Sequence, residues 1–600
     1  MAETASGLPR WDMSVVYPGV ESAEFDRDFR RLARDVADLG ALFDAQGVGL
    51  REPGPLDAAT VAIFETVTAR FNAVLEAAET IDAYLYAFIS TDSRDAVAQA
   101  RLSEYEQLAA RLTQLGIRFT AWVGSLDVEA LIRASGVAAA HAYPLRRACE
   151  QAKHLMSPAE ENLAAELRLT GGVAWQKLWG SISSQITVPI EREGRSFEMP
   201  MSALRNLAHE PDRALRRRAY EAELAAWQRH AVPLAAAMNG IKGEVSTLSR
   251  RRGWESPLAA ALFDNGIDRQ VLEAMLGAAR EYFPVFRRFL QAKARALGLE
   301  KLTWYDLFAP VGASSSRWDF AQAAEFVQAQ FGSYSPRLRD LAARAFAERW
   351  IDAEPREGKR DGAFCLHLRR DESRVLANYQ PTLTGVTTLA HELGHAYHNL
   401  TLADRLPLQR ETPMVLAETA SIFCETTVRL AALQKADRQE QLAILNDELT
   451  EAVQVVLDIT SRFLFEQGVF ERRAQRELSV EELNELMLRA QRDTYGDGLD
   501  QTVLHPYMWA AKPHYYSVGA QYYNFPYMFG LLFGLGLHVR YQADPEGFKA
   551  GYDELLSTTG LADAATLAGR FGIDIRSPQF WRSSLAAIKA NVDRFEALVG

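Results

Sequence analysis

Apolar residues recur every three or four positions along most of this 600-residue chain, with charged residues between them. This spacing puts the apolar side chains on one face of an α-helix, so it predicts a series of amphipathic helices. The clearest of them cover residues 26–47, 55–90, 93–115, 157–169 and 268–298. Ser479 and Glu482 form a capping box, which predicts the start of another helix. We therefore expect a mostly α-helical fold.

Strand patterns are confined to two regions. Residues 186–191 and 196–200 flank the polar turn 192–195, and residues 363–368 and 374–379 flank the polar turn 369–373. Both regions predict β-hairpins. We place a domain boundary at the first of them. Residues 1–195 are expected to form a helical N-terminal domain that ends in this hairpin, and residues 196–600 a larger second domain that carries the motifs described below.

Composition excludes several classes of protein. Hydrophobic residues make up 48% of the chain and the net charge is −12, which is typical of a globular protein and argues against nucleic acid or an anionic membrane as a partner. Cys149, Cys365 and Cys424 are too few and too far apart for a disulfide framework, which fits a reducing compartment. The first residues lack the pattern of a signal peptide. We expect a cytoplasmic protein.

One stretch without charged residues, 515–539, resembles a membrane segment by composition. It contains Gln521, Asn524, Pro526 and His538 together with several tyrosines. Lipid would leave these polar groups without hydrogen-bond partners. The segment is therefore expected to be buried in protein, with Gly530 and Gly534 allowing close helix packing.

The most informative motif is His391-Glu392-Leu393-Gly394-His395. On a helix, residues four apart lie on the same face, so the two imidazoles can bind one zinc ion while Glu392 takes a proton from metal-bound water. A catalytic zinc takes three protein ligands and a water molecule. The alternative for this motif is a pair of histidines with no metal.

Four downstream acids could supply the third ligand: Asp404, Glu411, Glu418 and Glu425. Residues 414–433 read as one apolar, buried helix, in which an unpaired carboxylate would be costly. Glu418 and Glu425 would lie two turns apart on one face of it. Glu418 is our predicted third ligand, and Glu425 is predicted to accept a hydrogen bond from a ligand histidine. The alternative for both is a salt bridge to a buried arginine.

A second polar cluster, residues 505–530, contains two histidines and six tyrosines. Such side chains can donate hydrogen bonds to an oxyanion that develops beside a metal ion. The alternative is an aromatic core helix whose hydroxyl groups are satisfied internally.

These motifs together resemble a known family. H-E-L-G-H-A-x-H at 391–398, A-E-T-A-S-x-F-x-E at 417–425 and H-Y-Y…Y-Y-N-F-P-Y-x-F-G at 514–530 are similar to the oligoendopeptidase F branch of the thimet oligopeptidase family of zinc metallopeptidases. Residues 11–29 and 358–364 resemble that branch as well. The resemblance implies a helical ellipsoid divided by a deep substrate channel, with a small sheet beside the zinc-binding helix. It makes residues 196–600 the catalytic domain.

The resemblance also assigns residues. His391, His395 and Glu418 match the ligands of one Zn²⁺ per chain, and Glu392 matches the general base. His514 and a tyrosine match the groups that bind the substrate carbonyl and the oxyanion. Tyr522, Tyr523 and Tyr527 compete for that place; we favour Tyr523 and Tyr527, and assign Tyr522 to substrate binding. Gly362, Ala363 and Phe364 resemble the strand that pairs with the peptide.

The predicted function is zinc-dependent cleavage of internal bonds in short peptides, by Glu-assisted attack of zinc-bound water. One alternative is a carboxypeptidase or dipeptidyl carboxypeptidase, for which Arg369, Arg370 and Arg374 are candidates to bind a free C-terminus. The others are a non-catalytic peptide-binding protein and a scaffold with a structural zinc site. The sequence does not determine the oligomeric state.

Overall fold

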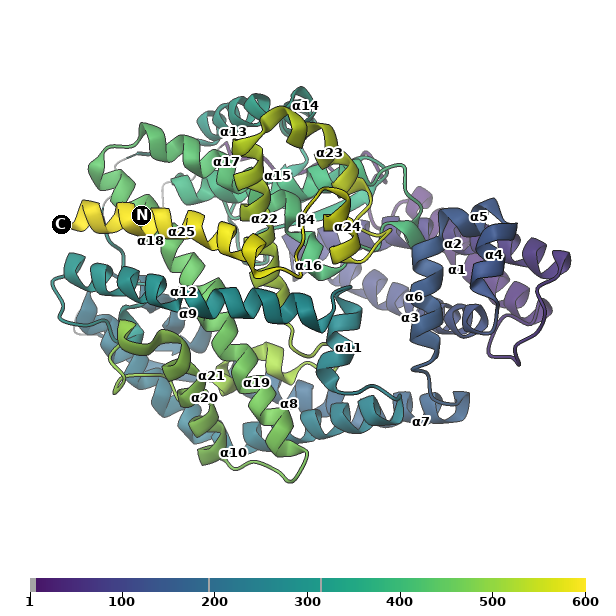
Figure 1. Cartoon of the computed structure of the whole chain (residues 1–600), viewed down its shortest axis with the longest axis horizontal. Helices are drawn as coiled ribbons and strands as arrows, with labels where there is room; N and C mark the ends of the chain where they lie inside the picture. Colours follow the sequence, from purple (N-terminus) through teal and green to yellow (C-terminus); the bar gives the residue numbers. More distant parts are fainter. Residues whose placement is uncertain (1–6, 193–194, 313–315) are drawn as a thin grey trace. The chain divides into compact units, whose positions relative to one another are not determined.

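The long helices begin where capping side chains satisfy their first free N–H groups. In the computed structural model, which describes residues 7–192, 195–312 and 316–600, Ser22 caps α1 (Ala23–Ala45) and Asp57 caps α2 (Ala58–Thr91). Asp268 caps α12 (Arg269–Ala296), and Ser479 forms the expected capping box of α20 (Val480–Tyr495). The predicted helices are therefore confirmed, and Figure 1 shows that helices dominate the whole chain.

The chain divides into two compact units, and each of them is assembled from three separate segments. The first unit comprises Met1–Leu155, Ser316–Ala432 and Arg540–Gly572, and the second comprises Met156–Ser315, Leu433–Val539 and Ile573–Gly600. The expected domain boundary at residue 195 stays a prediction. The expected substrate channel stays a prediction as well.

The first unit holds α1, α2 and most of the elements around the zinc motif. Its further helices are α3 (Ala96–Gly124), α4 (Val128–Ala134), α5 (Gly136–Ala140), α6 (Ala142–Ala152), α13 (Phe320–Tyr334), α14 (Pro336–Ala347), α15 (Leu383–Thr401), η3 (Pro407–Gln409), α16 (Met414–Ala417), the greater part of α17 (Thr419–Lys435), α23 (Pro545–Ser557) and α24 (Ala564–Arg570).

The second unit contains α12, α20 and one hairpin, β1 (Thr187–Arg192) with β2 (Arg195–Pro200). Its further helices are α7 (Pro158–Thr170), α8 (Gly172–Gln185), α9 (Met201–Asn206), η1 (Leu207–His209), α10 (Arg213–Arg251), α11 (Pro257–Asp264), η2 (Trp304–Asp306), α18 (Arg438–Val453), the π-helical turn η4 (Gln454–Asp458), α19 (Ile459–Arg473), η5 (Gly496–Gly498), α21 (Met508–Ala511), η6 (Pro513–Tyr516), most of α22 (Phe525–Ala543) and α25 (Pro578–Val599).

Both predicted hairpins form. In the first, β1 and β2 are antiparallel, with Thr187 opposite Pro200; residues 193–194 of its turn lie outside the described residues. In the second, β4 (Phe364–Arg369) pairs antiparallel with β5 (Glu372–Leu376). The predicted five-residue turn was too long, because only residues 370 and 371 separate the strands. Arg370 adopts a positive φ of 48°, which such a short connection requires.

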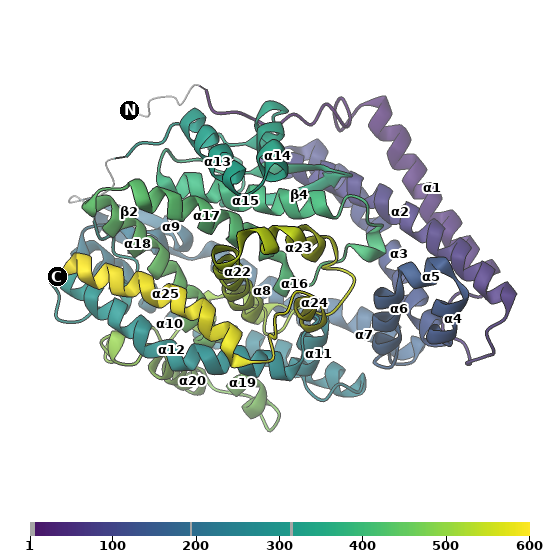
Figure 2. The same cartoon turned by 45° about the horizontal axis from the view of Figure 1, so that its top comes forward.

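The second hairpin belongs to a small sheet with the order β3-β5-β4, in which β3 (Ile351–Asp352) runs parallel to β5. The sequence patterns did not predict β3, which has only two residues. The zinc-motif helix α15 packs on β4 and β5, as expected for a sheet beside that helix, and Figure 2 shows α15 running beside β4. The strand β4 is an edge of the sheet.

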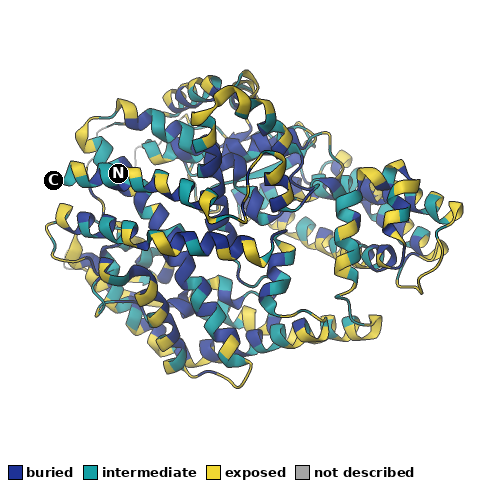
Figure 3. Ribbon diagram, viewed as in Figure 1, coloured by how far each residue is buried: buried dark blue, intermediate teal, exposed yellow. Residues whose placement is uncertain are grey.

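Buried residues, dark blue in the ribbon of Figure 3, are found in both units. In the first unit, Phe25, Phe64 and Tyr84 belong to a hydrophobic core that also contacts Phe364 and Leu366 of β4. In the second, Trp227, Trp509 and Tyr515 belong to a core around α10. In α1, α2 and α12 the apolar faces predicted from the helical period are the faces that pack. In α7 no described residue is buried, and Leu163, Leu167 and Leu169 are exposed.

Of the described helices, only α2 is long and apolar enough to span a membrane by length and composition. Its buried residues, among them Phe64, Val67 and Tyr84, belong to the core of the first unit. A helix at the centre of a helical unit meets the same criterion. In the stretch 515–539, Met528, Phe529 and Leu532 of α22 are buried as expected.

Candidate active site

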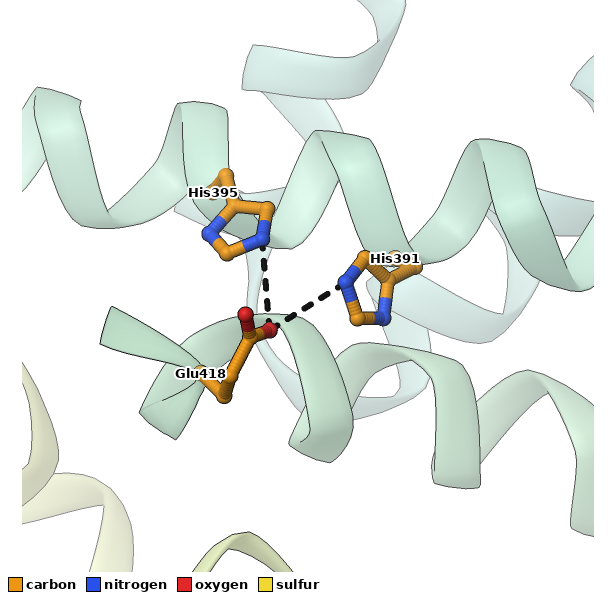
Figure 4. Close-up of side chains that lie close together, drawn as sticks. All are labelled: His391, His395 and Glu418. Atoms are coloured by element: carbon orange, nitrogen blue, oxygen red, sulfur yellow. Dashed lines mark ion pairs between the residues drawn. The ribbon is translucent and has the colours of Figure 1, made fainter. Parts of the chain in front are cut away.

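Helix α15 brings the two histidines of the motif to one face, one turn apart. Glu418 approaches them from the start of α17 (Figure 4). Its Oε2 lies 3.2 Å from Nε2 of His391 and 3.4 Å from Nε2 of His395. The three ligand atoms lie within 4.8 Å of one another. The structure thus brings together the three residues predicted to bind the metal.

The predicted single helix over residues 414–433 was wrong at one position, and that position is Glu418. α16 ends at Ala417 and α17 begins at Thr419. Glu418 sits between them with φ −85° and ψ 5°, and Ser421 Oγ donates a hydrogen bond of 2.6 Å to its Oε2. The carboxylate therefore lies at the N-terminus of α17, where the free N–H groups favour negative charge.

Gly394 explains how closely the two elements approach. A Cβ at this position would lie 2.6 Å from Cα of Ser421 and 2.7 Å from the carbonyl oxygen of Ala420. Only glycine lets α15 touch the backbone at the start of α17 in this way. The contact sets how far Glu418 lies from the histidines.

Glu425 accepts a hydrogen bond of 2.9 Å from Nδ1 of His391, as predicted from the sequence. This bond keeps a proton on Nδ1 and directs Nε2 at the site, so that Nε2 is the nitrogen that a metal ion would bind in place of a proton. The other oxygen of Glu425 is ion-paired with Arg429, one turn further along α17. The alternative for Glu425, a salt bridge to an arginine, is therefore present as well. Arg429 itself was not named from the sequence, although its spacing of four residues from Glu425 was a usable signal.

The group attracts positive charge. Burial lowers the pKa of His391, but its hydrogen bonds to Glu418 and Glu425 outweigh this effect and raise the pKa well above its ordinary value. Burial raises the pKa of Glu418, but hydrogen bonds with His391 and His395 dominate and hold it far below its ordinary value. The low pKa keeps the Glu418 carboxylate ionised, and an ionised carboxylate beside two imidazoles fits a metal-binding group.

The donor set and its spacing fit zinc. Zinc prefers imidazole nitrogen and carboxylate oxygen, at about 2.0–2.2 Å in a tetrahedral arrangement, which places neighbouring ligand atoms roughly 3.3 Å apart. The separations of 3.2 Å and 3.4 Å between Glu418 and the two histidines agree with this geometry. No fourth protein ligand belongs to this group among the described residues, which is the pattern of a catalytic rather than a structural site.

Glu392 and His398 lie on the same helix and have different surroundings. Glu392 is 6% exposed, and burial raises its pKa above the ordinary value while His391 and His395 oppose the rise. His398 lies 2.9 Å from Thr559 Oγ1, and burial lowers its pKa to about 4. His398 is therefore a neutral hydrogen-bonding residue rather than a ligand.

Gly362, Ala363 and Phe364 lead into the edge strand β4. Gly362 has a positive φ of 82°, and its carbonyl accepts a hydrogen bond from the Asn378 side chain. The ring of Phe364 packs on Tyr86 of α2 at 5.4 Å. Beside them is a cavity of about 450 Å³. Its lining residues are Tyr86, Ile89, Ser90, Ser93, Gln99, Gly358, Lys359 and Arg360.

The second predicted group forms within the second unit. His514 stacks flat on Tyr523, with ring centroids 4.9 Å apart and planes 11° from parallel. The hydroxyl groups of Tyr523 and Tyr527 are hydrogen-bonded at 3.1 Å. Burial lowers the pKa of His514 to about 4, and the charges of Arg462 and Lys512 add to this effect. The imidazole is therefore neutral at physiological pH.

Tyr522 has a different position. It is 5% exposed, and its ring packs against Phe463 and Phe470 of α19. These contacts make it a packing residue in this structure, and its assignment to substrate binding stays a prediction.

Two protein-family models match this chain. The model of peptidase family M3 matches residues 206–587, and the model described as Oligopeptidase F matches residues 126–187. The chain belongs to peptidase family M3. The resemblance to oligoendopeptidase F is thereby confirmed, and this M3 peptidase is an oligopeptidase that depends on a metal.

Proteins similar in sequence to this chain include named oligopeptidases. The chain is 21% identical over 605 residues to an oligoendopeptidase F homolog of Lactococcus lactis subsp. lactis, covering 98% of this chain and 97% of that protein. It is 26% identical over 456 residues to the group B oligopeptidase PepB of Streptococcus agalactiae, covering 74% of each.

Solved structures show the same fold. Oligoendopeptidase F from Enterococcus faecium aligns with a TM-score of 0.70 and 17% identity over 96% of this chain and 99% of that one. A structure from Chlamydophila abortus aligns with a TM-score of 0.81 and 20% identity over 98% of both chains. The expected helical fold is therefore confirmed for this M3 peptidase.

Proposed function

We propose that this M3 peptidase is a zinc-dependent endopeptidase that hydrolyses internal bonds of short peptides in the cytoplasm. The observation that supports it most directly is the group of His391, His395 and Glu418, which offers three ligands, beside a buried Glu392. A structural zinc site has a fourth protein ligand. A protein that only binds peptides does not require a general base such as Glu392.

His391, His395 and Glu418 would hold one zinc ion, with Glu425 and Arg429 fixing the tautomer and charge around His391. When bound, zinc supplies Lewis-acid chemistry: it polarises the peptide carbonyl and makes a water molecule more acidic.

Glu392 acts as the general base. Its carboxylate takes a proton from the water molecule that attacks the peptide carbonyl, and then passes this proton to the nitrogen of the leaving amine. The raised pKa of Glu392 suits both halves of the task, because a base with a very low pKa would hold the proton too weakly.

His514 and Tyr523, with Tyr527 as the neighbour that orients Tyr523, donate hydrogen bonds to the carbonyl oxygen as negative charge develops on it. A neutral His514 can donate one N–H without repelling the metal ion. Each donor of this kind contributes roughly 3 kcal/mol to the transition state.

The free edge of β4 binds the substrate backbone. An extended peptide can add to this edge by main-chain hydrogen bonds, starting at Gly362, Ala363 and Phe364. The cavity beside Tyr86 and Arg360 can receive a substrate side chain. Main-chain recognition predicts tolerance of sequence, so the length of the peptide is expected to limit cleavage.

The exopeptidase alternative lacks support from the residues suggested for it. Arg374 is 1% exposed and donates to the carbonyl oxygens of Asp12 and Ser373. Arg369 pairs with Glu372, and its Nη2 also donates a hydrogen bond to the carbonyl of Val15. Arg370 lies at the tip of the β4–β5 turn. The first two are already engaged, which leaves them poorly suited to bind a free C-terminus.

Digestion of a ladder of peptides of about 5 to 40 residues, followed by mass spectrometry, tests the proposal. We expect internal cuts confined to the shorter peptides, and no cuts by the Glu392→Gln variant. Stepwise loss from one end would replace the proposal by an exopeptidase. Absence of cleavage by the zinc-loaded wild type would favour a peptide-binding protein.

A further inference from the structure

A buried ion pair in the second unit joins two long helices. Lys242 of α10 donates a hydrogen bond of 2.6 Å from Nζ to Oε1 of Glu466 on α19. Their side chains are 0% and 3% exposed. Nζ also donates to Oε1 of Gln521 at 2.6 Å and lies 4.9 Å from the ring centroid of Phe470.

A buried ion pair is weak evidence for a stabilising role. Taking two charges out of water is costly, and packed apolar residues in their place are often equally or more stabilising. The other contacts of Lys242 and Glu466 therefore indicate the role of the pair.

The pair holds the chain next to Tyr523. The second oxygen of Glu466, Oε2, accepts a hydrogen bond of 3.1 Å from the backbone N–H of Tyr522. Gln521, which Lys242 holds, donates from its own amide to the carbonyl of Ser517 at 2.7 Å. We call residues 517–524 the Tyr523 loop. Both charged groups of the pair thus bond to this loop, at two successive residues.

The backbone held in this way is strained. Tyr522 has a positive φ of 53°, a left-handed conformation that is unfavourable for a residue other than glycine. Its ring packs on α19, whereas the ring of the next residue, Tyr523, lies flat on His514. The left-handed residue is what lets two neighbouring side chains serve these two places.

Other contacts hold the ends of the loop but not its centre. Arg168 donates to the carbonyl of Val518 at 2.7 Å, and Arg462 donates to Oδ1 of Asn524 at 3.0 Å. Between Val518 and Gln521 the loop passes through Gly519, which is exposed and has no atom within 4 Å of its Cβ position.

We propose that Lys242 and Glu466 are positioning residues: their buried ion pair fixes Tyr522 in the left-handed conformation and so holds Tyr523 against His514 for binding the substrate carbonyl. This inference rests on the proposed role of Tyr523 and His514. It predicts that loss of the pair loosens the loop and lowers kcat, with little change in KM.

The test replaces both members, by Lys242→Met with Glu466→Leu, so that no unpaired charge stays buried. Hydrogen exchange of peptides covering residues 517–524, followed by mass spectrometry, is expected to accelerate at least about tenfold. The value of kcat is expected to fall about tenfold or more. Tyr523→Phe should lower kcat strongly in the wild type and add little in the double variant, because residues acting as a unit are not additive.

Lys293→Met is the matched control. Lys293 is a second buried lysine of the same unit, and it donates to Leu307 and Thr450, outside the loop. Its loss should change neither the exchange of residues 517–524 nor the effect of Tyr523→Phe. Gln521→Ala removes the hydrogen bond from Lys242 to the loop and leaves the ion pair intact. It serves as the test variant if the double variant does not fold.

The outcomes separate the two levels of inference. Unchanged exchange of the loop in both variants would overturn the positioning role. Faster exchange with unchanged kcat would show that the pair orders the loop without serving catalysis, and would also overturn it. If Tyr523→Phe and His514→Asn alone leave kcat unchanged, the proposed function of those two residues fails instead, whatever the exchange measurements show.

Discussion

Glu392 has the buried carboxylate, the raised pKa and the place beside His391 and His395 that a general base requires. We expect Glu392→Gln to retain one bound zinc. Its kcat should fall by about a hundredfold to ten-thousandfold, because an amide cannot take the proton. Zinc is measured by mass spectrometry of the purified protein and kcat with a fluorogenic peptide.

The control for this substitution is Glu325→Gln, an exposed glutamate on α13 of the same unit. Its activity should equal that of the wild type. Full turnover by Glu392→Gln would exclude Glu392 as the base, and loss of zinc would mean that the substitution acts through the metal site.

Lys293 makes stability depend on pH. Burial lowers its pKa from 10.5 to about 7, with smaller opposing effects from nearby charges. Between pH 7 and 10.5 the folded state has therefore released a proton that the unfolded state still binds, so stability rises with pH in this range. Lys293→Met abolishes this contribution.

The free energy of unfolding of Lys293→Met, measured relative to the wild type at the same pH, should be about 2 kcal/mol lower at pH 9 than at pH 7. Urea unfolding at the two pH values measures this difference. Lys301→Met, at an exposed position, controls for the loss of a lysine as such. An equal stability difference between variant and wild type at both pH values would contradict the assignment.

At the scale of elements, the contact between α15 and the start of α17 sets the metal site. Gly394→Ala places a methyl group against the backbone of Ser421, so the two elements must separate. We expect a loss of about 1–3 kcal/mol in stability and weaker zinc binding, as Glu418 moves away from the histidines. Chelator competition measures the zinc affinity.

Gly277→Ala is the matched control, since Gly277 lies in helix α12 with no atom within 4 Å of its Cβ position. Alanine there should stabilise the protein by about 0.5–1 kcal/mol and leave zinc affinity unchanged. Unchanged zinc affinity in Gly394→Ala would show that the close contact does not position Glu418.

Sequence patterns predicted elements that repeat and missed those that break the repeat. Apolar spacing located α1, α2 and α12 to within a few residues, because packing and capping follow the same period. It also located α7, whose leucines are exposed. The break at Glu418 has no such signal. Residues 414–433 are helical by pattern, and only the tertiary contact with α15 at Gly394 shows where the helix stops.

The candidate site divides in the same way. The metal ligands follow from residue type and spacing, and Glu425 from its place in a buried helix. The Lys242–Glu466 pair could not be found so directly, since charged residues at helical spacing usually lie on solvated faces. Lys242 and Glu466 are also 224 positions apart, and only the fold brings them together.

For the whole molecule, metal content should govern thermal stability. A ligand that binds only the folded state adds about 4 kcal/mol at a thousandfold excess over its dissociation constant. We expect chelation of zinc to lower the unfolding temperature and its re-addition to restore it, as measured by calorimetry. Glu418→Ala, which removes one ligand, should unfold at the same temperature with and without chelator, and a zinc-insensitive wild type would contradict a site of this kind.

The assembly of each unit from three segments has a consequence for synthesis on the ribosome. Helix α15 packs on α23, and Tyr397 hydrogen-bonds to Asp553. At synthesis rates of about 5–20 residues per second, α23 emerges roughly ten seconds or more after α15 has been made. During that interval the first unit is incomplete and its apolar surfaces are open to other nascent chains. The protein is therefore expected to need chaperone protection during translation, and to fold only once nearly all of its sequence has been made.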